Sequence, residues 1–191
     1  MNRTDWGSLF EEVHPESGAS EAEISHLIED VTRPLSPAEI EEMNRKLVDV
    51  AERFKRMDPR GGASNVVARI DPSKWELPQG SLPESYLAFL RWSNGGSFRS
   101  GEKWFDPVFR TDEVRGYLLG YDLPEWMPGA LPFAFDGAGT FYVFDMRGPP
   151  RNGEYPILVA HAGNLGFLGS RQTGSTFLET CSARQHPMSL S

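Results

Sequence analysis

The residues of this sequence best suited to acid–base chemistry are one histidine and two aspartates. His161 ends the strand-like run 155–161, Asp136 follows the run 130–135, and Asp145 lies near the end of another run. A histidine that meets a carboxylate across neighbouring strands can act as a general base. A histidine at a strand end more often bonds the backbone, so we favour a structural role for His161.

Metal binding and nucleophilic catalysis have no motif here. Four histidines, His14, His26, His161 and His186, are scattered, and Cys181 is the single cysteine. These residues do not have the paired spacing of a structural zinc site. Gly-x-Ser-x-Gly, Gly-x-x-x-x-Gly-Lys and His-Glu-x-x-His patterns are absent as well. We therefore predict no catalytic residue, no cofactor and no metal.

Composition favours a protein partner. The 191 residues suffice for one hydrophobic core, and the net charge is −8. Residues 1–60 carry 14 acids and 8 bases, whereas residues 61–191 carry 13 and 11. An acidic surface repels phosphate backbones and attracts cationic proteins, which argues against direct nucleic-acid binding. Without a long apolar run, a signal-peptide pattern or a cysteine pair, we expect a cytoplasmic protein that does not span a membrane.

A long helix is predicted to begin after Ser36. Pro37 fits the first helical position, and Glu39 stands three residues after Ser36, which completes a capping box. Apolar residues then recur at spacings of three and four: Ile40, Met43, Leu47, Val50 and Phe54. This stripe is typical of an amphipathic helix.

The chain is predicted to hold one domain with an N-terminal extension. Residues 1–35 are acidic and interrupted by prolines and a glycine, with one short helix expected over 21–31. Residues 36–191 form the domain, in which the proline- and glycine-containing segment 58–64 ends the long helix.

The second half of the chain reads as a helix followed mainly by strands. A helix is expected to start at Pro83, and Thr111 is expected to cap a brief one. Strands are predicted over 97–107, 130–135, 140–146 and 155–161, with a short terminal helix over 175–181. Asp136-Gly137 predicts a hairpin turn between the second and third of these runs.

The segment 82–96 carries the strongest motif. It reads Leu-Pro-x-x-Tyr-x-x-Phe-Leu and then Asn-Gly-Gly, formed by Leu82, Pro83, Tyr86, Phe89, Leu90, Asn94, Gly95 and Gly96. Helical spacing places the aromatic and aliphatic members on one buried face, and glycine supplies backbone conformations that other residues reach at a cost. These residues are predicted to serve the fold.

This motif resembles the SUKH superfamily, which groups bacterial immunity proteins with the Smi and Knr cell-wall regulators of fungi. The glycine-rich hairpin over 132–145 and the last strand with the terminal helix, 155–178, are also similar, so the resemblance spans 82–181. It implies an α+β fold whose central, largely antiparallel twisted sheet is flanked by helices. The long N-terminal part and Thr180-Cys181, where large apolar residues are expected, depart from the family pattern.

One segment has the composition of a partner-binding surface. Asp112, Glu113, Asp122 and Glu125 stand close in sequence to Trp126, and acids beside an exposed aromatic residue suit a basic partner. Solvated acids beside a core tryptophan are the more frequent arrangement.

The resemblance implies binding rather than catalysis, because bacterial members commonly neutralise toxin domains, often nucleases. We expect an immunity protein that binds a toxin directly. Two alternatives stay open: a small hydrolase that uses His161 with Asp136 or Asp145, and a regulatory scaffold of the Smi/Knr type.

Overall fold

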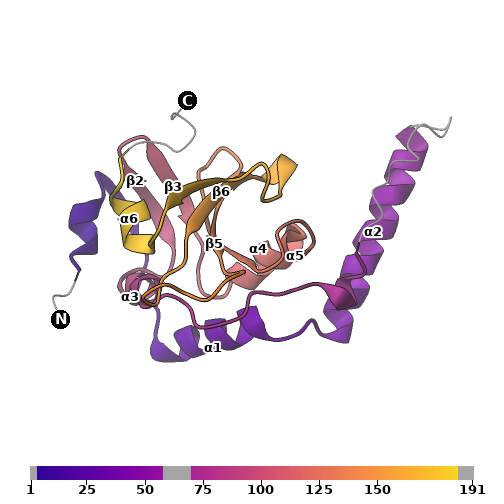
Figure 1. The fold of residues 1–191 in the computed structure, drawn as a ribbon, viewed down its shortest axis with the longest axis horizontal. Coiled ribbons are helices and arrows are strands. Elements are labelled where there is room, and N and C mark those ends of the chain that lie inside the picture. The colour runs from indigo at the N-terminus through magenta and orange to yellow at the C-terminus, as the bar shows by residue number, and fades with distance from the viewer. Residues whose placement is uncertain (1–3, 58–69, 185–191) are drawn as a thin grey trace.

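The computed structural model describes residues 4–57 and 70–184 and shows one sheet surrounded by helices, with α2 standing away from the rest (Figure 1). Seven strands form the sheet in chain order, and every neighbouring pair is antiparallel. The strands are β1 Glu12–Pro15, β2 Gly96–Ser100, β3 Lys103–Val108, β4 Ala130–Phe135, β5 Thr140–Asp145, β6 Ile157–His161 and β7 Arg171–Gly174. The predicted α+β class with an antiparallel sheet is confirmed.

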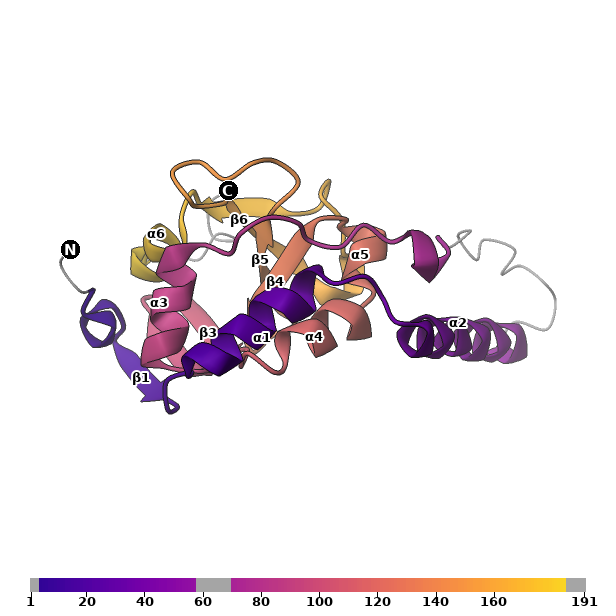
Figure 2. The same cartoon turned by 90° about the horizontal axis from the view of Figure 1, so that it is seen from below.

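Helices cover both faces of this sheet. They are α1 Glu21–Thr32, α2 Pro37–Met57, α3 Glu84–Trp92, α4 Val114–Gly120, α5 Leu123–Trp126 and α6 Phe177–Ser182, with 3-10 turns η1 Trp6–Leu9, η2 Pro72–Lys74 and η3 Ala162–Asn164. Side chains of a strand alternate between faces. Phe144 packs against Tyr86 of α3 and Phe177 of α6, whereas Phe141 packs against Tyr121 at the end of α4. Figure 2 shows α1 crossing between α3 and α4, so it joins the two helical layers.

Both N-terminal helices begin with capping boxes. The backbone N–H of Glu23 donates to the Ser20 hydroxyl, and the Glu23 carboxylate accepts from the Ser20 backbone, 2.7 Å away. Ser36 and Glu39 repeat this arrangement at the start of α2. The helix expected over 21–31 and the capping box predicted at Ser36 are therefore confirmed.

The start of α2 is tied to the body by a buried arginine. Arg115 of α4 donates to both carboxylate oxygens of Glu39, at 2.7 and 3.1 Å, and to the Asp30 and Arg33 carbonyl oxygens near the end of α1. The Arg115 side chain is only 6% exposed. Hydrogen bonds from Arg115, followed by those from Arg33, hold the pKa of the Glu39 carboxyl well below its ordinary value.

Residues before α1 add a strand and core side chains to the sheet. β1 pairs with β2, with Glu12 opposite Arg99. The Trp6 ring lies 5.4 Å from that of Phe89, and both residues are buried. No strand was predicted here, because four residues ending in proline show too little alternation. Its register depends on pairing with a strand more than 80 positions away along the chain.

Two side chains fix turns between the strands and helices. Asp136 Oδ1 accepts from the backbone N–H of Ala138 at 2.7 Å and of Thr140 at 2.8 Å, which closes the predicted β4–β5 hairpin. Thr111 does not cap α4, contrary to expectation. It exchanges two hydrogen bonds with the buried Asn94, and α4 begins three residues later. Thr111 therefore joins the turn after α3 to the segment before α4.

Candidate functional site

The acids predicted for partner binding begin at the entry to α4. The Asp112 side chain is 67% exposed and pairs with Arg110, with 3.2 Å between Oδ1 and Nε. Glu113 accepts from the Arg110 backbone N–H at 3.0 Å. Arg110 also bonds Glu16 at 2.8 Å. Asp112 is thus a surface charge within a small ionic network, while Glu113 supports the backbone.

The other predicted members lie at the far end of α4. Asp122 occupies the turn into α5 with a φ of 53°, a conformation that aspartate tolerates better than most residues. Glu125 is only 9% exposed, whereas Trp126 is 38% exposed. Asp112 and Glu113 precede α4 and Asp122 follows it, so the predicted set is divided between two ends of one helix. Trp126 and Asp122 face solvent more than Glu125 does.

A cavity of about 310 Å³ opens beside Trp126. Its walls are Tyr121, Trp126, Ala162, Gly163, Asn164 and Leu165. Tyr121 comes from the α4–α5 turn and Trp126 from the end of α5, whereas the others come from η3 and the residue after it. The walls are aromatic, aliphatic and amide groups, so this cavity offers contact area and orientation rather than acid–base or nucleophilic groups.

Of the two aspartates named from sequence with His161, Asp136 lies at the same end of β5 as the histidine, and Asp145 lies at the opposite end. His161 pairs with Thr140 at one end of β5, whereas Asp145 lies at the other end, about 16 Å away at the rise of an extended strand. His161 Nδ1 accepts from the Gly163 N–H at 3.1 Å and so caps η3. Asp145 holds Arg147 at 2.7 and 2.8 Å, and these hydrogen bonds lower the pKa of its carboxyl. Asp136 bonds its own turn, as described above. The three are engaged locally and do not form a charge-relay arrangement.

The residues of the 82–96 motif lie in the core, as predicted. Tyr86, Phe89 and Leu90 are fully buried on α3. Gly95 and Gly96 have positive φ angles, and a Cβ on Gly96 would lie only 2.4 Å from the His14 carbonyl oxygen. The glycine therefore lets β1 approach the turn closely enough to pair with β2.

A family comparison agrees with this arrangement. The model of the SMI1 / KNR4 family (SUKH-1) matches residues 70–179, which contain α3, the six strands β2 to β7 and the start of α6. The chain belongs to this family. The match begins after α2, so β1, α1 and α2 lie outside the part of this SUKH-1 protein that the family model covers. A search of curated proteins finds no match.

Buried polar groups of the SUKH-1 protein gather under α6. Lys103 is fully buried at the start of β3 and donates to the Thr180 carbonyl oxygen. Burial lowers the pKa of this lysine to about 8 and raises that of the Cys181 thiol. A buried thiol with a raised pKa is a poor nucleophile and a poor metal ligand. We assign this cluster to the attachment of α6.

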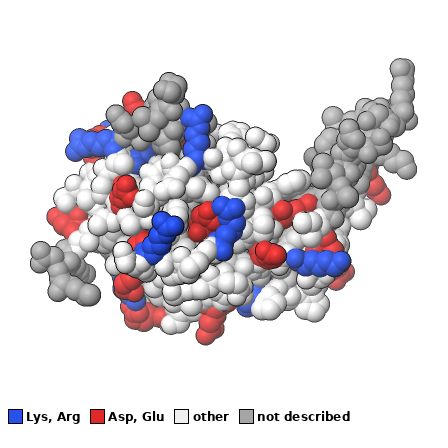
Figure 3. Space-filling view, viewed as in Figure 1, with Lys and Arg blue, Asp and Glu red and all other residues white. Residues whose placement is uncertain are grey.

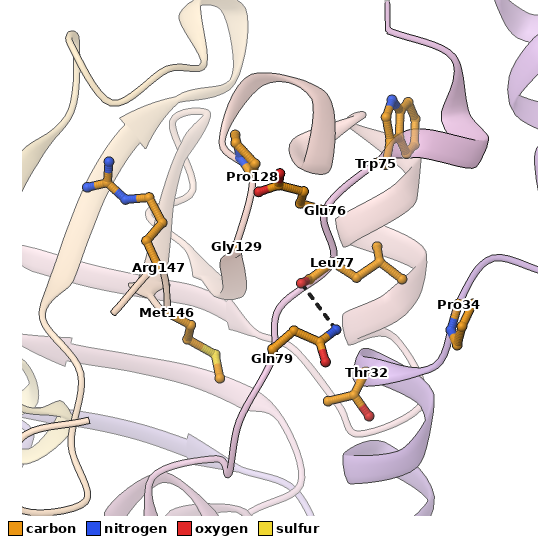
Figure 4. A pocket seen from close by; sticks show the side chains of 10 residues that line it. All are labelled: Thr32, Pro34, Trp75, Glu76, Leu77, Gln79, Pro128, Gly129, Met146 and Arg147. Atoms are coloured by element: carbon orange, nitrogen blue, oxygen red, sulfur yellow. Dashed lines mark hydrogen bonds between the residues drawn. The ribbon is translucent and has the colours of Figure 1, made fainter. Parts of the chain in front are cut away.

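Two further hollows of this protein lie around Arg147. One, of about 500 Å³, is drawn in Figure 4, where the segment 75–79 runs between Thr32 and Pro34 on one side and Met146 and Arg147 on the other. A second, of about 670 Å³, extends from Arg147 past the loop before β6 to the start of α6. The charge of Arg147 is already balanced by Asp145. None of the residues that line these two hollows is a histidine or a cysteine.

The described residues offer no resident metal site. They hold no group of three or more histidine, cysteine or acidic side chains that could bind a metal ion. Within residues 4–57 and 70–184, no helix combines the length and apolar character needed to cross a bilayer.

Several surface features were missed by sequence reasoning. Tyr121 and Leu165 join Trp126 in one cavity although they come from segments about 40 residues apart. Leu168, which is fully exposed on the same loop as Leu165, lies in the sequence Gly-Phe-Leu-Gly. An apolar pair between glycines is the one local signal that could have identified this loop.

Proposed function

We propose that this SUKH-1 protein is a cytoplasmic immunity protein that neutralises a toxin domain by direct binding. The observation that supports it most is the local engagement of every residue considered for catalysis. His161 caps η3, Asp136 closes a turn, and Asp145 holds Arg147. A protein without an assembled reactive group can still block a toxin by covering its active site or a surface beside it.

Charge supports a protein partner over a nucleic acid. The chain carries 19 basic and 27 acidic residues. On the face shown in Figure 3, the two signs are interspersed over a larger uncharged surface rather than gathered into a basic stripe. Phosphate recognition needs such a stripe, whereas steering of a cationic protein needs only a negative net field. A basic toxin domain, such as a nuclease, fits this charge.

The surface that runs from the start of α4 to the end of α5 is the proposed binding face. Asp112 and Asp122 supply surface charge, and Trp126 supplies partly exposed aromatic area. Charges at the rim of an interface act mainly on the association rate, whereas anchors at its centre act mainly on dissociation. Asp112→Lys with Glu113→Lys should therefore slow association, and Trp126→Ala should speed dissociation.

Binding kinetics with the purified toxin domain encoded next to this chain's own coding sequence would test the proposal. The wild type should bind, and association should slow as salt rises from low to moderate concentration, because salt screens the charges. Glu41→Lys with Glu52→Lys on α2 is the matched control, since it changes the net charge equally at exposed positions outside the face. The thermal midpoint of each variant would confirm folding. Absence of such a neighbouring toxin, or of wild-type binding, would contradict the proposed function.

A further inference from the structure

The loop between η3 and β7 displays the most exposed large apolar side chain of the described residues. Leu168 is fully exposed, and no other large apolar side chain in the described part of the chain exceeds 57%. Burial of one leucine is worth about 1.5 to 3 kcal/mol. A leucine held entirely in water is therefore a ready source of binding free energy for a protein partner.

Several contacts hold this loop in place. The Arg147 guanidinium lies 3.5 Å from the centre of the Phe167 ring, and Asp145 binds the same guanidinium. The Ser170 hydroxyl donates to the Phe167 carbonyl oxygen at 2.9 Å. Phe167 is thus packed inward while its neighbour Leu168 points to solvent. A prearranged anchor loses less conformational entropy on binding than one on a free loop.

The cavity beside Trp126 adjoins this loop. Asn164 lines the cavity, and a Cβ on Gly169 would lie 3.3 Å from the Asn164 side chain, so the residue after Leu168 touches the cavity wall. Tyr121 is 41% exposed and Trp126 38%. An exposed leucine and a hollow with aromatic walls therefore lie next to each other. The leucine can insert into a pocket of the partner, and the hollow can accept a side chain of the partner.

The charges around the cavity favour a cationic occupant. None of the six lining residues is a lysine or arginine. Asp122 follows Tyr121 directly, and Asp136 follows Phe135, whose ring lies 5.6 Å from that of Tyr121. Tyrosine and tryptophan faces attract lysine and arginine side chains, and nearby acids strengthen that attraction.

We propose that this surface, made of Leu168 and the cavity lined by Tyr121, Trp126 and Asn164, anchors the partner of the SUKH-1 protein. Leu168 enters an apolar pocket of the partner, and a lysine or arginine from a partner loop enters the cavity. The inference rests on the proposed function, because it names the anchoring part of the same α4–α5 face and the chemistry of the segment that docks there.

The first test replaces the exposed leucine. Leu168→Asp should weaken binding of the neighbour-encoded toxin domain at least about 30-fold, as expected for an anchor residue, and should leave the thermal midpoint unchanged because the side chain has no buried contacts to lose. Leu178→Asp on α6 is the matched control, since Leu178 is 38% exposed and lies outside this surface. It should bind like the wild type. Tight binding by the wild type and by Leu168→Asp alike would overturn the inference and leave the proposed function standing.

The second test asks what enters the cavity. Asn164 is exposed and lines the wall, so its side chain can be exchanged without loss of core contacts. Asn164→Lys should weaken toxin binding at least 10-fold, because the new lysine side chain fills the cavity and repels the lysine or arginine of the partner. Asn164→Asp should bind as tightly as the wild type or more tightly. Equal effects of the two substitutions would overturn the cationic occupant. A wild type that does not bind would instead contradict the proposed function itself.

Discussion

The α3–α6 face of the sheet and the surface around Leu168 use similar residues for opposite purposes. In the first, Tyr86, Phe89 and Phe177 are at most 1% exposed, and the Phe177 ring contacts the ring of Tyr86 in a tilted arrangement and that of Phe89 edge to face. In the second, Tyr121 and Leu168 leave much or all of their side chains in water. An aromatic or leucine side chain therefore indicates neither core nor binding surface by its type. The packing of segments distant in sequence decides between them.

The sharpest contrast between the two regions is in stability. Tyr86→Ala and Phe89→Ala should each lower the free energy of unfolding by about 3 to 5 kcal/mol, because each deletes a buried ring and leaves a cavity. Leu168→Asp should change it by less than about 0.5 kcal/mol. Urea denaturation measures all three. Tyr86→Phe serves as the control, since it keeps the ring and removes a hydroxyl that has no hydrogen-bond partner among the described residues. Unchanged midpoints for both alanine variants would contradict the core assignment.

The junction between α1, α2 and α4 should respond to loss of its ion pair. Arg115→Met keeps a long apolar stem but removes the bonds to Glu39, so it should cost about 3 kcal/mol, as removal of one partner from a buried pair does. Arg91→Met is the control, because Arg91 pairs with carboxylates that are more than 70% exposed and should cost less than about 1 kcal/mol. Equal losses in urea denaturation would show that Arg115 does not act as a buried clamp.

The sequence predicted the parts of the fold that depend on neighbours along the chain. The Ser36 capping box spans four residues, and the α3 motif with its glycine turn spans fifteen, so each carries its own physical signal. Arg115 and Glu39 stand 76 positions apart, and the cavity joins Tyr121 to Leu165. No local sequence pattern predicts such contacts, because they depend on how distant segments are arranged around the sheet.

The side chains of the predicted partner-binding segment lie in different environments for the same reason. Trp126 was named for its acidic neighbours, and the structure places it in a cavity wall. Glu125, from the same short helix, turns out to be mostly covered. In a helix of four residues, a rotation about the helix axis by one residue changes which side chains face the sheet. Composition alone gives no information on that rotation.

The buried lysine offers a smaller effect that is specific to the α3–α6 face. Burial lowers the pKa of Lys103 to about 8 in the folded protein, below its ordinary value of 10.5 in the unfolded chain. Between these values the unfolded chain binds the extra proton, so stability should rise with pH. From pH 7.5 to 10, the wild type should gain about 2 kcal/mol relative to Lys103→Met. Urea denaturation of both proteins across this range isolates the lysine, because the buried Tyr86, Tyr142 and Cys181 are common to both. A constant difference would mean that folding does not lower the pKa of Lys103.

The central claim is that this SUKH-1 protein neutralises a toxin by binding it and not by catalysing a reaction. Titration of the neighbour-encoded toxin with the protein tests this claim most directly. Toxin activity would be measured after mixing at increasing molar ratios and after increasing times. A binding protein should abolish the activity in proportion to its amount, with an endpoint at a fixed stoichiometric ratio that does not change with time. His161→Ala should give the same endpoint. Complete loss of toxin activity at a small fraction of that ratio, progressing with time and absent in His161→Ala, would contradict the account and reveal an enzyme.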